Sequence, residues 1–143
     1  AVHEGGNADA RADVALANTL AGFVETLSSC TGEHAIEHAL SAYHPALPHG
    51  AGLIMISKAY WSRFMESSGD RLVAIARALG RTDADKPEDC NVHELRLSGY
   101  GVQPEDFGKI ADNAIDTMGG LFRVDPRPLA REDIIGILED SYK

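Results

Sequence analysis

The chain has 143 residues, which is enough for roughly one domain with a real hydrophobic core. Its formal net charge is −9 and no basic stripe is present of the kind that phosphate-backbone binding requires, so nucleic acid is excluded as a partner. Two cysteines are too few for a secreted disulfide framework, and no apolar run approaches the ~18 residues of a membrane span. We therefore expect a cytoplasmic protein with no membrane partner.

Apolar residues recur at intervals of three and four along most of the chain, which predicts helices almost throughout. A first helix is expected over residues 8–27, with one apolar stripe formed by Leu16, Leu20, Phe23, Val24 and Leu27. A second helix is expected to have Thr31 as its N-cap and to end near Tyr43, because the position before Pro45 disfavours the helical conformation.

The remaining helices follow from the same periodicity. A third is expected after Gly50, with an apolar face of Leu53, Ile56, Tyr60 and Phe64. Asp70 is expected to cap a shorter helix that ends before Gly80, and a polar loop should follow over residues 81–94. A helix beginning at Pro104 should end at a glycine pair, and a last helix should use Ile134, Ile135 and Leu138. Because no segment alternates strictly, the fold class is all-α, a helical bundle.

Four of the six histidines lie between residues 34 and 49. His34 and His38 are four residues apart on the predicted second helix, which places both side chains on one face about 6 Å apart. His49 follows a short loop stiffened by two prolines, so the chain can double back and hold His49 near that helix. Imidazole is the commonest metal ligand, so we predict a metal site that uses His49 and at least one of His34 and His38. His44 precedes a proline and is expected to be an exposed loop histidine.

Two other functions remain open at this point. Together with Glu37, the histidines His34 and His38 spell HxxEH, the motif of zinc peptidases in which two histidines bind zinc and the glutamate activates water. If the chain is not a peptidase, Glu37 either contacts a residue that binds the metal or is exposed to solvent. In the third hypothesis the chain is a metal-free helical interaction module, and the histidines contribute only to stability.

Residues 30–57 read CTGEHAIEHALSAYHPALPHGAGLIMIS. They resemble the signature of the iron-containing (group III) alcohol dehydrogenases, which have an HxxxH, then a Pro-His-Gly, then a helix start rich in small residues. Residues 18–23, 97–101, 125–129 and 132–134 resemble flanking parts of that family. The resemblance implies a dehydroquinate synthase-like helical bundle. It makes residues 1–143 a single metal-binding domain, the C-terminal part of a longer two-domain enzyme whose N-terminal dinucleotide-binding domain is absent.

The resemblance also implies a reaction, namely hydride transfer between an alcohol or aldehyde and NAD or NADP, with Fe²⁺ or Zn²⁺ as a Lewis acid. By position, His34 and His49 are similar to two of the family's metal ligands. His38 is similar to the histidine that faces the nicotinamide and the substrate without binding metal, which gives His38 a catalytic and cofactor-binding role. Glu37 has no ligand role in this scheme and is expected to be dispensable for metal binding.

The family's two upstream ligands, an aspartate and a histidine, have no counterpart in this sequence. We therefore expect the isolated chain to bind metal weakly and to lack dehydrogenase activity. The implied partners are a small alcohol or aldehyde, the protein's own N-terminal domain and, in an oligomer, further copies of the chain. A stretch of the family pattern that usually forms one more helix is missing between Asp89 and Cys90.

Overall fold

A computed structural model describes residue 1 and residues 3–80 and 96–142. The described residues form helices and turns and contain no strand, which confirms the predicted all-α class. Among them, no helix is both long enough and apolar enough to cross a membrane. The chain divides into two compact units, Ala1–Cys30 and Thr31–Lys143.

The first unit contains α1, which spans Ala8–Ser28 and so agrees with the prediction to within one residue. Asn7 caps the helix, because its side-chain oxygen accepts the Ala10 N–H at 3.0 Å. The helix ends where Ser29 takes a positive φ of 66°. The predicted apolar stripe lies on α1 but is not buried, since all five of its side chains are more than half exposed: Leu16, Leu20, Phe23, Val24 and Leu27.

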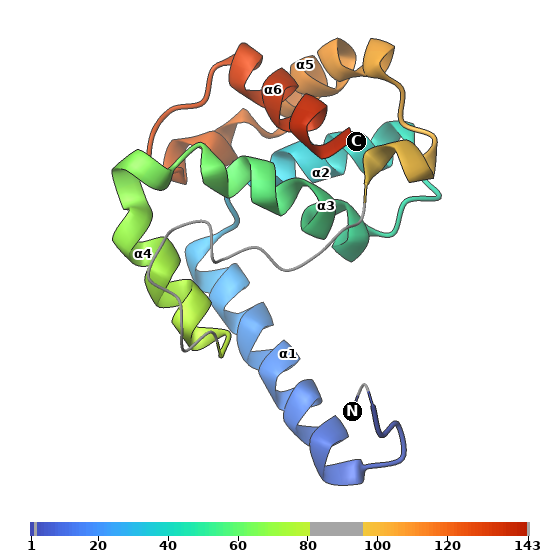
Figure 1. Cartoon of the computed structure of the whole chain (residues 1–143), viewed down its shortest axis with the longest axis vertical. Helices are drawn as coiled ribbons and strands as arrows, with labels where there is room; N and C mark the ends of the chain where they lie inside the picture. The colour runs from blue at the N-terminus through green and yellow to red at the C-terminus, as the bar shows by residue number, and fades with distance from the viewer. Residues whose placement is uncertain (2, 81–95, 143) are drawn as a thin grey trace. The chain divides into compact units, whose positions relative to one another are not determined.

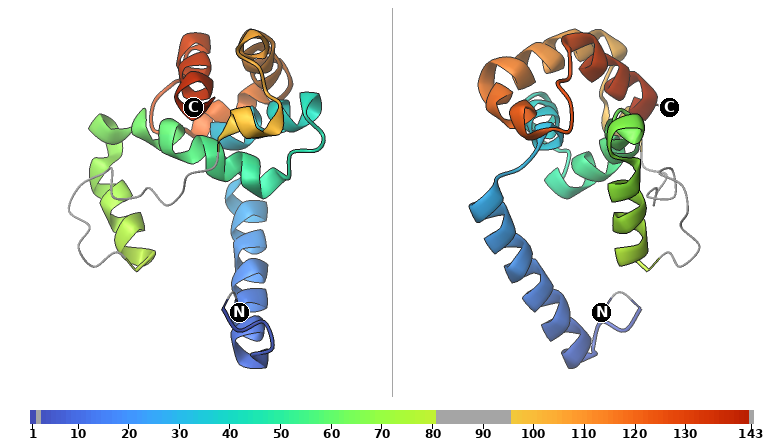
Figure 2. Two further views of the ribbon diagram at one scale, coloured as in Figure 1. Left: turned by 45° about the vertical axis from the view of Figure 1, so that its right-hand side comes forward. Right: turned by 90° about the vertical axis from the view of Figure 1, so that its left-hand side faces the viewer.

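The second unit is built on four helices, α2 (Gly32–Tyr43), α3 (His49–Ser62), α5 (Phe107–Met118) and α6 (Arg131–Tyr142). α2 contacts α3 and α5, and α6 contacts α3 and α5, so α5 and α6 form a layer over α2 and α3 (Figures 1 and 2). The apolar faces of all four meet in one core, whose fully buried side chains include Ile36, Leu40, Ile56, Tyr60, Ile110, Ile134 and Leu138. This packing fixes α2 against α3, the two helices that carry the clustered histidines.

Two helix starts differ from the prediction. α3 begins at His49 instead of after Gly50, because Pro48 already occupies the extended N-cap position (φ −65°, ψ 133°). Asp70 does not begin a helix of its own. It lies within α4 (Met65–Ala78), which is interrupted at Ser68, where φ is −145° and ψ is 24°. The expected break is therefore a kink two residues before Asp70.

The C-terminal part follows the prediction more closely. Pro104 opens a short 3-10 turn, Pro104–Asp106, that leads directly into α5. The glycine pair ends α5 as expected, although the chain continues as a 3-10 helix over Gly119–Val124. The predicted loop over residues 81–94, and with it the missing stretch at Asp89 and Cys90, lies outside the described residues.

Candidate metal centre

Three imidazole rings lie together where α2 faces the start of α3. His34 and His38 come from α2, and His49 is the first residue of α3. The ring centroids are 5.4 Å apart for His34 and His49, 5.2 Å for His38 and His49, and 6.2 Å for His34 and His38. An ion about 2 Å from a nitrogen of each of two rings holds their centroids roughly 5 Å apart. Both centroid distances from His49 to the histidines of α2 are of this size, whereas the potential ligand atoms that all lie within 4.8 Å of one another belong to Glu37, His38 and His49 and not to His34.

The loop between α2 and α3 explains how His49 returns to α2. The His44 N–H donates to the Leu40 carbonyl at 2.8 Å and closes α2, and the Leu47 N–H donates to the His44 carbonyl at 2.9 Å. Leu47 is buried in the core and anchors the loop, after which α3 begins. His44 itself is outside the cluster. It is not the exposed loop residue that we expected, because its side chain is only 15% exposed and its Nε2 lies 3.5 Å from a carboxylate oxygen of Asp106.

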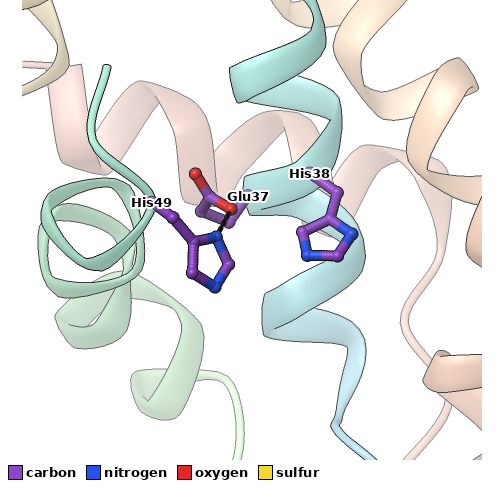
Figure 3. A group of neighbouring side chains, drawn as sticks. All are labelled: Glu37, His38 and His49. Atoms are coloured by element: carbon purple, nitrogen blue, oxygen red, sulfur yellow. Dashed lines mark hydrogen bonds and ion pairs between the residues drawn. The ribbon is translucent and has the colours of Figure 1, made fainter. Parts of the chain in front are cut away.

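Glu37 lies beneath the histidines, and no part of it is exposed. One carboxylate oxygen accepts the Ser41 hydroxyl at 2.5 Å, and the other pairs with Nδ1 of His49 (Figure 3). Ligand atoms of Glu37, His38 and His49 all lie within 4.8 Å of one another. Of the two alternatives left open for Glu37, the solvated one is wrong, because α3 packs over its side chain.

The other two histidines differ in exposure. His38 is exposed, and its Nδ1 lies 3.0 Å from the sulfur of Met118 at the end of α5. His34 is only partly exposed, between the buried residues Glu33 and Ala35. The His38 ring is thus the more accessible of the two on α2.

A second group of polar side chains lies at the N-terminus of α2, one turn before Glu37. The carboxylate of Asp125 accepts the Gly32 N–H at 3.0 Å and the Tyr60 hydroxyl at 2.5 Å, so it joins the first residue of α2 to α3. Burial raises the pKa of Asp125, and burial together with the hydrogen bond to Asp125 raises the pKa of Tyr60. Thr31 occupies the N-cap position of α2 as predicted, but its side chain makes no capping hydrogen bond, and Asp125 accepts the Gly32 N–H instead.

Glu33 belongs to the same region. It is 8% exposed, its carboxylate accepts the Ser57 hydroxyl of α3 at 2.5 Å, and burial raises its pKa to about 7. Ser57, Tyr60 and Asp125 were not identified from the sequence as part of the site. No local pattern identifies them, because each acts on α2 only through the packing of the folded unit.

Comparison with known proteins identifies the family. Residues 1–142 match the Fe-containing alcohol dehydrogenase family, C-terminal. The chain belongs to the iron-containing alcohol dehydrogenase family. Solved structures of alcohol dehydrogenases agree with this. An archaeal halo-thermophilic alcohol dehydrogenase from a Red Sea brine pool, bound to NZQ, has a TM-score of 0.87 and 28% sequence identity over 98% of this chain.

Two further solved structures are also similar to this chain. A single-residue variant of the Red Sea brine pool enzyme has a TM-score of 0.89 and 29% identity over 98% of this chain. The alcohol dehydrogenase from Oenococcus oeni has a TM-score of 0.83 and 25% identity over 96%. The comparison with curated proteins gave no match. The chain covers only 40%, 40% and 39% of these three alcohol dehydrogenases, so it corresponds to the C-terminal helical domain of the family.

Proposed function

We propose that this chain is the metal-bearing helical domain of a longer, two-domain, NAD(P)-dependent alcohol dehydrogenase. The observation that carries the proposal is the group of three imidazoles on α2 and α3, one of them held by a buried carboxylate, in a chain of this family. The rest of the protein would supply the dinucleotide site.

We assign His34 and His49 as ligands of a divalent ion, Fe²⁺ or Zn²⁺. Imidazole nitrogen suits both ions, and the 5.4 Å between the two ring centroids fits a shared ion. His38, whose ring is exposed, is assigned to face the nicotinamide and the substrate. This assignment follows the family resemblance, and the difference in exposure between His34 and His38 supports it.

When bound, the metal would act as a Lewis acid on the oxygen of an alcohol or aldehyde while NAD(P) accepts or donates the hydride. The residues of this chain would bind the ion and orient the ligating imidazole rings. Two imidazoles leave coordination positions free for ligands from the remainder of the protein and for the substrate. The His49 side chain is 50% exposed, so a ligand can reach it from solvent.

The burial of Glu37 argues against the zinc-peptidase alternative. A glutamate that activates a metal-bound water must meet that water, whereas Glu37 is fully buried with both oxygens engaged by Ser41 and His49. We therefore do not assign Glu37 as a general base.

A Zn²⁺ titration of the chain, followed through its histidine ring NMR signals, tests the ligand assignment. Zn²⁺ should shift the signals of His34 and His49, and replacing either by alanine should weaken binding at least tenfold, because only one of the two assigned ligands remains. His38→Ala should retain most of the binding. His44→Ala is the matched control, because His44 belongs to the same segment but lies outside the cluster.

Binding that survives in both the His34→Ala and the His49→Ala variant would overturn the assignment. Equal losses in His34→Ala and His38→Ala would instead make both histidines of α2 ligands, which contradicts the role given to His38.

A further inference from the structure

We propose that Glu37 is a positioning residue that fixes the tautomer and the orientation of His49, so that Nε2 of His49 is the nitrogen presented to a metal. The inference deepens the proposed function and rests on its assignment of His49 as a ligand. It differs from the expectation that Glu37 is dispensable for metal binding.

The first step concerns the proton between the two residues. A carboxylate oxygen accepts a hydrogen bond from a ring N–H, so in the proposed pair the nitrogen of His49 that faces Glu37 is the donor. That nitrogen is Nδ1. In a neutral imidazole with the proton on Nδ1, the lone pair is on Nε2, which points away from the carboxylate in Figure 3. Glu37 thus selects the tautomer in which the outer nitrogen can bind a metal.

The second step concerns how firmly the carboxylate is held. Its other oxygen accepts the hydroxyl of Ser41, one turn further along α2, at 2.5 Å. Gly52 of α3 lies directly against the side chain, because a Cβ atom there would stand 2.7 Å from Oε1 and 2.8 Å from Cγ of Glu37. With no exposed surface and both oxygens engaged, the Glu37 side chain is confined by α2 and α3. The half-exposed ring of His49 depends on this contact for its orientation.

The third step separates positioning from direct coordination. Ligand atoms of Glu37, His38 and His49 are close enough for Glu37 to be considered a ligand itself. Both of its oxygens, however, are already engaged by Ser41 and His49, and the side chain is inaccessible from outside. A carboxylate that orients a ligating histidine in this way typically changes metal affinity by about 10–100-fold when it is removed.

The tautomer of His49 in the metal-free chain is the direct test. We would record ¹⁵N chemical shifts of the ring at pH 8, above the ordinary imidazole pKa of about 6.5, in the wild type and three variants. The wild type should show His49 with its proton on Nδ1. Glu37→Met, similar in length but a much weaker acceptor, should shift His49 toward the tautomer with the proton on Nε2. Glu37→Gln keeps an acceptor and should restore the wild-type tautomer in large part.

Glu33→Gln is the matched control. Glu33 is also buried on α2 and also accepts a serine hydroxyl, but that serine is Ser57 and the contact involves no histidine. This variant should leave the His49 tautomer unchanged, and it reports what the loss of a buried carboxylate on α2 does to the fold alone. A wild-type His49 protonated on Nε2 would overturn the proposal, as would a Glu37→Met variant with unchanged tautomer.

Zn²⁺ affinity is the second readout, measured on the same four proteins. Glu37→Met should bind Zn²⁺ about 10–100-fold more weakly than the wild type, with Glu37→Gln between them. Unchanged affinity in Glu37→Met would overturn the positioning role, and complete loss in both Glu37 variants would make Glu37 a ligand instead. If the wild type does not bind Zn²⁺ at all, the proposed function fails, while the tautomer measurement still decides whether Glu37 orients His49.

Discussion

Gly52 and Gly50 are two glycines of the first turn of α3 with opposite surroundings. A Cβ at Gly52 would press against the buried Glu37 side chain, whereas a Cβ at Gly50 would meet nothing within 4 Å. In a helix, glycine to alanine ordinarily stabilises by about 0.5–1 kcal/mol, but forcing a methyl group into a packed site costs about 1–3 kcal/mol.

Gly52→Ala should therefore lower the free energy of unfolding by about 1–3 kcal/mol, and Gly50→Ala should leave it unchanged or raise it by up to about 1 kcal/mol. Urea denaturation of both variants beside the wild type measures the difference. Equal stability of the two variants would mean that Glu37 can move aside and that Gly52 does not confine it.

At the residue scale, the sequence predicts which histidines lie together, but it does not predict which residues contact them and hold α2 in place. The i,i+4 spacing of His34 and His38 and the proline-containing loop before His49 indicate a common site directly. The contact of Glu37 with His49 depends on how α3 packs on α2, which local spacing does not specify. Asp125 is 93 residues from Gly32, so no cap signal near α2 could have revealed it.

At the scale of elements, α6 is tied to the preceding segment by Asp133. Its carboxylate accepts the Ala130 N–H at 2.9 Å and two N–H groups of Arg127 at 3.3 Å each. The hydrogen bond from Arg127 is the main cause that lowers the pKa of Asp133 below its ordinary value. Arg127 also donates to the Arg63 carbonyl at 3.1 Å, so this network connects the start of α6 with the end of α3.

A lowered folded-state pKa means that ionised Asp133 contributes stability above its unfolded pKa of about 3.9, and that this contribution is lost as the pH falls through the lower folded value. Asp133→Asn should therefore reduce the free energy of unfolding at pH 7 and make its fall between about pH 5 and pH 2 shallower. Urea unfolding across this pH range measures both effects.

Asp140→Asn is the control for this prediction. Asp140 pairs with Arg63 at 2.9 Å but is 63% exposed, and exposed pairs are screened by solvent, so stability should hardly change. An Asp133→Asn variant with the stability and acid response of the wild type would contradict the role given to the Arg127 network.

Helices are the best-predicted level of this structure. Apolar spacing together with glycine and proline positions predicts α1, α2, α5 and α6 closely. The sequence predicts a helix cap at Asp70, whereas the structure has a kink at Ser68 within α4, because a backbone interruption inside a continuous polar stretch leaves no distinct sequence signal. The apolar stripe of α1 was also identified correctly, but periodicity alone cannot say whether a stripe is buried.

At the scale of the whole molecule, the chain corresponds to only part of the alcohol dehydrogenases that it resembles. It covers about 40% of the alcohol dehydrogenases that it resembles and supplies three clustered imidazoles. Under the proposed function, the remaining ligands and the dinucleotide site would be formed by residues outside these 143, so they cannot be derived from this sequence. The central claim is thus that His34 and His49 complete a metal site whose other half belongs to the same, longer protein.

The most direct test is the intact mass of the protein purified from its own source, with metal analysis of the same sample. We predict a mass of at least twice the 15.3 kDa of this chain, and one iron or zinc ion per polypeptide. A mass of 15.3 kDa with one tightly held zinc would contradict the account. The site would then be complete within these residues, and a small zinc enzyme would be the better description.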